Sequence, residues 1–128
     1  MKPLTAEWVA KAEGDFATAC REAAVADAPN WDAVCFHAEQ RAEKYLKARI
    51  VEAGASFPKT HDLTVLLDLV LVFEPGWGEL RASLEALTDA AVEFRYPGYS
   101  ADETDASAAL AAATALRAQA RDALDPSA

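Results

Sequence analysis

Apolar side chains recur every three or four residues in each long segment of this chain, and this periodicity constrains the fold more than any other feature. That spacing is typical of one face of an α-helix, and no segment alternates as a half-buried strand would. Much of the apolar content is Ala, the strongest helix former. Helices are predicted over about residues 5–26, 31–53, 60–73, 79–96 and 100–124. Short connections favour an all-α, antiparallel up-and-down helical bundle of four main helices plus a shorter one.

Several predicted helices carry recognisable start and stop residues. Thr5, Asn30 and Thr60 are expected N-caps, because a side-chain oxygen there accepts a hydrogen bond from a free backbone N–H. Residues 100–103 (Ser-Ala-Asp-Glu) have the spacing of a capping box for the fifth helix. Gly54 is expected to end the second helix, and the tail from about residue 125 is expected to fray.

Length and cysteine usage indicate a single intracellular domain over residues 1–128. Cys20 and Cys35 fall inside predicted helices rather than in a spaced disulfide framework, which suits reduced thiols. The first nine residues lack the apolar stretch of a signal peptide, and no run of about twenty apolar residues is present for a membrane span. We therefore expect a cytoplasmic protein with no membrane segment.

The net charge of −9 has the wrong sign for general binding to DNA or another phosphate backbone, which depends on Lys and Arg. The excess acidic residues lie toward the two ends of the chain. The middle carries a cluster of basic residues: Arg41, Lys44, Lys47, Arg49 and Lys59. A local anion-binding site therefore stays compatible with the acidic composition.

Four short motifs follow one another in the order found in one protein family. Residues 35–48 (Cys-Phe-His-Ala-Glu-Gln-Arg-Ala-Glu-Lys-Tyr-Leu-Lys-Ala) resemble the signature helix of HEPN (higher eukaryotes and prokaryotes nucleotide-binding) domains. Residues 12–16 (Ala-Glu-Gly-Asp-Phe) are similar to the family's acidic position in the first helix. Residues 58–63 (Pro-Lys-Thr-His-Asp-Leu) resemble its loop before the third helix, and residues 94–97 (Phe-Arg-Tyr-Pro) its Arg-Tyr-Pro element. Together these motifs span almost the whole chain.

The resemblance implies a homodimer that binds nucleotide or RNA and has a small nucleotidyltransferase as its partner, in a prokaryotic toxin–antitoxin or defence pair. In catalytic HEPN ribonucleases, an Arg is followed four to six residues later by His, and the two cut RNA without metal at the dimer interface. Here Arg95 matches, but residues 96–102 (Tyr-Pro-Gly-Tyr-Ser-Ala-Asp) follow it, and no His occurs after His61. Standard HEPN nuclease chemistry is therefore not expected.

Arg95 is the leading candidate for a functional side chain, because a cation there would stabilise the charge that develops on phosphorus during RNA cleavage. The alternative is a structural ion pair with Asp15, which is expected nearby if the bundle forms as predicted, anchoring the turn into Pro97. Tyr99 is a further candidate, since a Tyr near the Arg motif is a target of nucleotide transfer in HEPN–nucleotidyltransferase pairs. The plainer interpretation is that Tyr96 caps the core and Tyr99 covers a loop.

His37, Gln40 and Lys44 share a stripe of the second predicted helix, away from its main apolar stripe. On a free surface they would simply be solvated. In a dimer cleft they would bind phosphate or a nucleobase, and His37 would replace the missing catalytic His. His61 precedes Asp62, which is expected in the first turn of the third helix, and hydrogen bonding at that helix start is favoured over catalysis. The spacing of Cys and His predicts no metal site, and no cofactor is expected.

Three hypotheses follow. The first is a HEPN subunit that pairs with a nucleotidyltransferase and binds nucleotide or RNA in a cleft between the second and fourth helices. The second is a metal-independent endoribonuclease that uses Arg95 with a displaced base such as His37. The third is a structural helical-bundle dimer in which the polar cluster only fixes packing.

Overall fold

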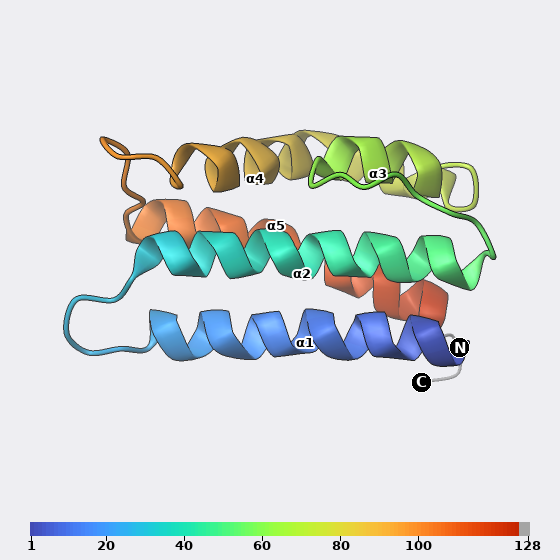
Figure 1. The fold of residues 1–128 in the computed structure, drawn as a ribbon, viewed down its shortest axis with the longest axis horizontal. Helices are drawn as coiled ribbons and strands as arrows, with labels where there is room; N and C mark the ends of the chain where they lie inside the picture. Colours follow the sequence, from blue (N-terminus) through green and yellow to red (C-terminus); the bar gives the residue numbers. More distant parts are fainter. Residues whose placement is uncertain (126–128) are drawn as a thin grey trace.

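The computed structural model describes residues 1–125, and in these residues every regular element is a helix (Figure 1). The elements in chain order are α1 (Pro3–Ala23), α2 (Trp31–Glu52), α3 (Leu63–Val70), the 3₁₀ helix η1 (Pro75–Leu80), α4 (Arg81–Glu93) and α5 (Glu103–Leu124). The predicted all-α fold of four main helices plus a shorter one is confirmed. The expected fraying of the tail concerns residues that lie, from 126 on, outside the described part of the chain.

The four long helices run alternately in opposite directions, as Figure 1 shows for α1, α2, α4 and α5. α2 is the central helix, since it packs against α1, α3, α4 and α5. This position explains why α2 carries apolar residues on two sides. Phe36 and Ile50 both lie on the face of α2 nearly opposite its main apolar stripe: Ile50 is fully buried in the core, whereas Phe36 stays partly exposed beside α4.

A polar network inside the bundle ties α1, α2 and α5 together. The hydroxyl of the fully buried Tyr45 on α2 donates to the carboxylate of Glu13 on α1, and Arg117 Nε on α5 donates to Glu13 Oε1 at 2.8 Å. Burial raises the pKa of Glu13, but these hydrogen bonds and the charge of Arg117 outweigh it and hold the pKa below 4.5. The Arg41 guanidinium is also buried, 3.7 Å from the centre of the Phe16 ring.

The helix starts confirm some of the predicted caps and correct others. Asn30 caps α2, accepting from the backbone N–H of Ala33 at 3.0 Å. The prediction for Thr5 is wrong, because α1 already begins at Pro3, a residue that favours the first helical position. Thr5 therefore lies inside α1, and its buried hydroxyl donates to Glu52 at the end of α2. α1 also ends at Ala23, three residues earlier than predicted.

The third and fifth helices begin later than expected. Asp62, not Thr60, caps α3, because its Oδ1 accepts from the backbone N–H of Thr64 at 2.9 Å. Likewise Asp102, not Ser100, caps α5: it accepts from the backbone N–H of Asp105 and donates its own N–H to the Asp105 carboxylate. A capping box is thus present, shifted by two residues, because the carboxylate of Asp102 serves as a stronger acceptor than a hydroxyl.

The ends of the helices follow backbone geometry more closely than apolar periodicity. Gly54 has a φ of +76° and ends α2 as predicted, with the backbone N–H groups of residues 54 and 55 bonded to the carbonyls of Val51 and Ile50. α3 ends at Val70 rather than Phe73, and α4 ends at Glu93 rather than Tyr96. Turns occupy residues 94–98, so Arg95 lies just beyond the last turn of α4.

Candidate functional site

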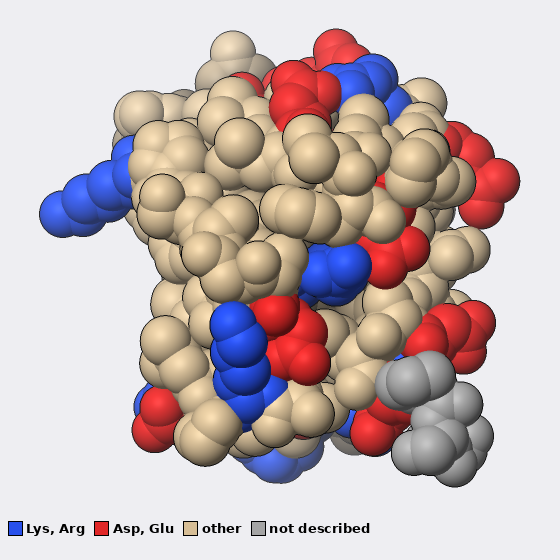
Figure 2. Space-filling view, turned by 90° about the vertical axis from the view of Figure 1, so that its right-hand side faces the viewer, with Lys and Arg blue, Asp and Glu red and all other residues tan. Residues whose placement is uncertain are grey.

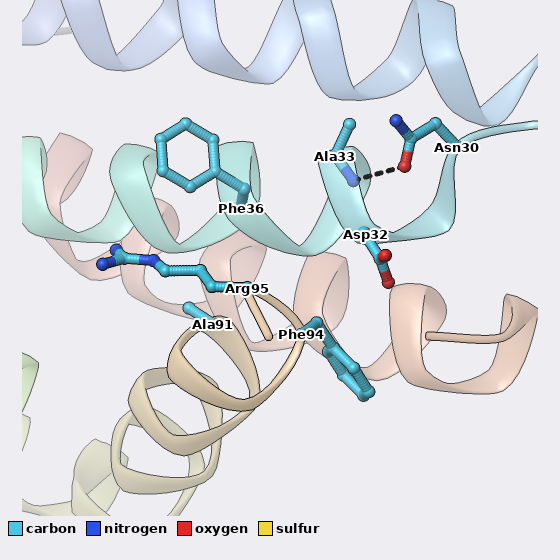
Figure 3. A pocket seen from close by; sticks show the side chains of 7 residues that line it. All are labelled: Asn30, Asp32, Ala33, Phe36, Ala91, Phe94 and Arg95. Atoms are coloured by element: carbon cyan, nitrogen blue, oxygen red, sulfur yellow. Dashed lines mark hydrogen bonds between the residues drawn. The ribbon is translucent and has the colours of Figure 1, made fainter. Parts of the chain in front are cut away.

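Two cavities lie side by side in the groove between α2 and α4, and Arg95 lines both. The Phe36 cavity, of about 260 Å³, is lined by Asn30, Asp32, Ala33, Phe36, Ala91, Phe94 and Arg95 (Figure 3). The Glu39 cavity, of about 220 Å³, is lined by Glu39, His61, Asp62, Thr88, Ala91, Val92 and Arg95. α2, the segment before α3 and the end of α4 therefore converge on one guanidinium group.

Arg95 reaches this position because α4 ends before it. Figure 3 shows its side chain extending from the end of α4 along α2, on the side of Phe36, while Phe94 points the other way. The Arg95 side chain is exposed, and within residues 1–125 it makes no ion pair shorter than 4 Å and no hydrogen bond. A cation without a protein carboxylate is available to an anionic ligand.

Glu39 forms the inner wall of the Glu39 cavity and is only 1% exposed. Its Oε2 accepts from the side-chain amide of Gln40 at 2.9 Å, whereas its Oε1 has no hydrogen-bond partner among the described residues. Burial, followed by repulsion from Glu43, raises the pKa of Glu39 to about 7, against the opposing effects of Gln40, His61 and Arg95. Glu39, which lines the cavity, thus has one buried acceptor without a partner in the described residues.

A second buried carboxylate, that of Glu43, contacts His61, which lines this cavity. Glu43 is one turn after Glu39 on α2, and its Oε1 lies 2.7 Å from Nδ1 of His61. Its Oε2 accepts from Lys47 at 3.2 Å. The expectation that His61 hydrogen-bonds within the start of the third helix is wrong, because Asp62 performs that role and His61 reaches across to α2. The His61 side chain remains 67% exposed.

Asp15, His37 and Lys44 gather on another side of α2, facing α1. Asp15 Oδ1 lies 2.8 Å from His37 Nδ1, and Asp15 Oδ2 accepts from Lys44 Nζ at 2.5 Å. The expected structural ion pair between Asp15 and Arg95 is absent from the described residues, because the Asp15 carboxylate is already bound by these two groups of α2. None of the three residues lines either cavity between α2 and α4.

The remaining predicted site residues are divided between the cavity and the solvent. Gln40 approaches the Glu39 cavity indirectly, through its hydrogen bond to Glu39. Tyr96 is 61% exposed in the turn after α4, so the interpretation that it caps the core is wrong. Tyr99 is also exposed, in the segment that leads to α5. That segment is held to α2 by the backbone N–H of Ala101, which donates to Asp32 at 2.7 Å.

The basic cluster in the middle of the chain is mostly neutralised by folding. Arg41 is buried, Lys44 pairs with Asp15, and Lys47 pairs with Glu43. Arg49 pairs with Glu74 at 3.1 Å. At the end of the bundle that Figure 2 faces, Lys and Arg side chains lie beside Asp and Glu side chains. The acidic composition and this pairing leave Arg95 as the cation that the α2–α4 groove offers.

Sequence reasoning overlooked Glu39, Glu43 and Thr88 as lining or bracing residues. A signal for Glu39 was present in the sequence: it continues the buried stripe of α2, in line with Cys35, Ala42 and Leu46. A carboxylate on a buried stripe is uncommon without a partner or a function. Thr88 carried no such signal, because its position depends on the packing of α3 against α4, where its Oγ1 accepts from the backbone N–H of Leu63.

Residues 1–125 contain no group of three or more His, Cys, Asp and Glu side chains arranged to hold a metal ion. None of the helices described is both long and apolar enough to traverse a lipid bilayer.

Comparison with known proteins identifies one family. The family model described as HEPN domain matches residues 5–122, which is nearly the whole chain and all the elements that line the α2–α4 groove. No curated protein and no solved structure matches. At the level of the family, the match supports a function that involves nucleotides or RNA.

Proposed function

The chain belongs to the HEPN domain family, and from that premise we propose that it binds the phosphate of a nucleotide or RNA end at Arg95. The observation that carries this proposal is the Arg95 guanidinium, which is unpaired within residues 1–125 and forms the shared wall of two cavities. Arg presents several N–H donors in a planar fork that matches phosphate oxygens. The apolar side chains that line the two cavities give a nucleobase or ribose a surface beside it.

We further propose that the protein acts in the cytoplasm as the HEPN subunit of a two-component, toxin–antitoxin-like pair with a small nucleotidyltransferase, and that it forms a homodimer. The exposed Tyr96 and Tyr99 in the segment after α4 are accessible to such an enzyme. Tyr99 is the residue that we assign as its target. Co-expression with a nucleotidyltransferase encoded beside the gene, followed by co-purification and mass spectrometry of residues 96–102, tests both the association and the modification.

Standard HEPN nuclease chemistry is not part of this proposal, because a general acid or base is needed beside the phosphate. No His follows Arg95, and His37 is held by Asp15 outside both cavities. One observation favours a nuclease nonetheless: His61 lines the Glu39 cavity together with Arg95. If the protein cleaves RNA, His61 rather than His37 is the displaced base.

The test measures binding and cleavage of a labelled single-stranded RNA in EDTA by wild type, Arg95→Ala, His37→Ala and His61→Ala. We expect binding that falls about tenfold in Arg95→Ala, as for the loss of one charge-assisted contact, and no cleavage by any variant. Arg81→Ala is the matched control, because Arg81 is on α4 but pairs with Asp68 outside the groove.

Unchanged binding in Arg95→Ala would refute the assignment of the phosphate site. Cleavage by wild type that is lost in both Arg95→Ala and His61→Ala, with His37→Ala unaffected, would make the protein a ribonuclease of the displaced-base type.

A further inference from the structure

We propose that Glu39 Oε1 selects nucleotides that carry an exocyclic amino group, with the nucleobase in the Glu39 cavity and the phosphate outside at Arg95. This inference rests on the proposed function, and adds to it a specificity-determining residue and a substrate class. It starts from a physical anomaly: one carboxylate oxygen of Glu39, a residue that lines the cavity, is shielded from water and has no hydrogen-bond partner in residues 1–125. A buried acceptor left in this state costs free energy, and a ligand donor would remove that cost.

One end of the cavity has a hydrogen-bond acceptor and the other end has a cation. A nucleotide has the complementary groups, an amino donor on its base and an anion at its phosphate. At the inner end, Glu39 offers an acceptor with a fixed position, because its other oxygen is held by Gln40 at 2.9 Å. At the outer end, the exposed Arg95 offers donors and a positive charge. An amino group on a base therefore meets the acceptor, and a phosphate on the ribose side meets the cation in solvent.

The size and walls of the cavity fit the same ligand. Its volume of about 220 Å³ is below the range of pockets that enclose a whole drug-sized molecule, so it suits a base with the phosphate left outside. Ala91 and Val92 of α4 give an apolar side for the faces of the ring, and the exposed His61 imidazole lies at the rim. Thr88 supplies a hydroxyl at the wall.

Other charged groups around Glu39 do not satisfy its free oxygen. Glu43, on the next turn of α2, is itself an acceptor and is bound to His61 and Lys47. Asp62, before α3, accepts from both the backbone and the hydroxyl of Thr64. Arg95 attracts the Glu39 carboxylate without a hydrogen bond to it. The free oxygen therefore still lacks an N–H donor, which the exocyclic amino group of a nucleobase provides.

The experiment compares adenosine 5′-monophosphate with purine riboside 5′-monophosphate, which differs only by lacking the amino group. Titration calorimetry or a competition assay against labelled RNA gives both affinities for wild type, Glu39→Met and Glu39→Gln. We expect wild type to prefer the amino-bearing nucleotide by about tenfold, as for one hydrogen bond to a charged group. Glu39→Met should remove the preference, and Glu39→Gln, which keeps an uncharged acceptor, should reduce it. Glu85→Gln, an exposed change of the same charge on α4, is the control.

The same chemistry is offered by a free nucleotide and by the terminal nucleotide of an RNA. A 5′-phosphorylated tetranucleotide that begins with adenosine, compared with one that begins with purine riboside, distinguishes these sources: a preference confined to the tetranucleotides assigns the site to RNA ends. Equal binding of both members of each pair, with binding still dependent on Arg95, overturns the role of Glu39 and leaves the proposed function intact. Absence of binding by any probe overturns the proposed function itself.

Discussion

Glu39 and Glu43 are one turn apart on α2 and both buried, and of the two only Glu43 has basic side chains, Lys47 and His61, within hydrogen-bond distance. The two carboxyls therefore differ in their hydrogen-bond partners. Glu39 accepts from a neutral amide alone, so burial and the neighbouring negative charge dominate its pKa. A group with this environment titrates near neutral pH, and the stability of the folded protein is coupled to that titration.

Replacing Glu39 by Gln should stabilise the protein at pH 8 and have little effect at pH 4.5. The folded-state pKa of about 7 exceeds the ordinary 4.5, so the native state binds more protons between these values, and wild-type stability falls as pH rises through them. Removing the charge should restore roughly 3 kcal/mol at pH 8, from about 1.4 kcal/mol per pKa unit. Urea denaturation at pH 4.5, 6, 7 and 8 measures this difference. A gain that does not vary with pH would show that Glu39 does not titrate in this range.

The helix ends at which carboxylates bind backbone N–H groups are the clearest features at the level of elements. Asp62 begins α3 and Asp102 begins α5, each two residues after the hydroxyl residue, Thr60 or Ser100, that the sequence predicted as the cap. The helix N-terminus carries partial positive charge, and so an anionic cap gains both a hydrogen bond and a charge–dipole interaction. The charge–dipole interaction explains why the aspartates, and not the preceding hydroxyl residues, cap these helices.

Asp102→Ala should destabilise the protein by about 1 kcal/mol, the usual cost of losing an N-cap. The loss comes from the hydrogen bond to the Asp105 N–H and from the reciprocal bond of the capping box. Ser100→Ala is the matched control, because Ser100 precedes α5 and its side chain makes no hydrogen bond within the described residues. Chemical denaturation measures both variants, and equal losses would mean that Ser100 shares the capping role.

The charge of the whole molecule makes a prediction about ligand binding. With a net charge of −9, and with Lys44, Lys47 and Arg49 in ion pairs, the protein offers a long RNA few phosphate contacts. The logarithm of the affinity for single-stranded RNA should therefore fall with the logarithm of salt concentration with a slope of about −1, since each contacted phosphate contributes about −0.7.

The slope should become flatter in Arg95→Ala and stay unchanged in Arg81→Ala, and fluorescence anisotropy between low and physiological salt measures it. A steep slope that persists without Arg95 would place RNA on a broad basic surface. The melting temperature of Arg95→Ala should equal that of wild type, because Arg95 has no ion pair in residues 1–125 to lose.

Periodicity and four ordered motifs were sufficient to predict the helices and the family, because helix formation depends on side chains three and four residues apart. They also placed His37 and Lys44 on one side of the second helix, but they paired Asp15 with Arg95 instead of with these two residues. They could not predict which side of α2 faces Arg95. α2 packs against four helices, so most of its sides face some neighbour, and the rotation of the helix about its axis is set by the combined packing of all of them. Packing therefore directed Glu39, rather than His37, toward Arg95.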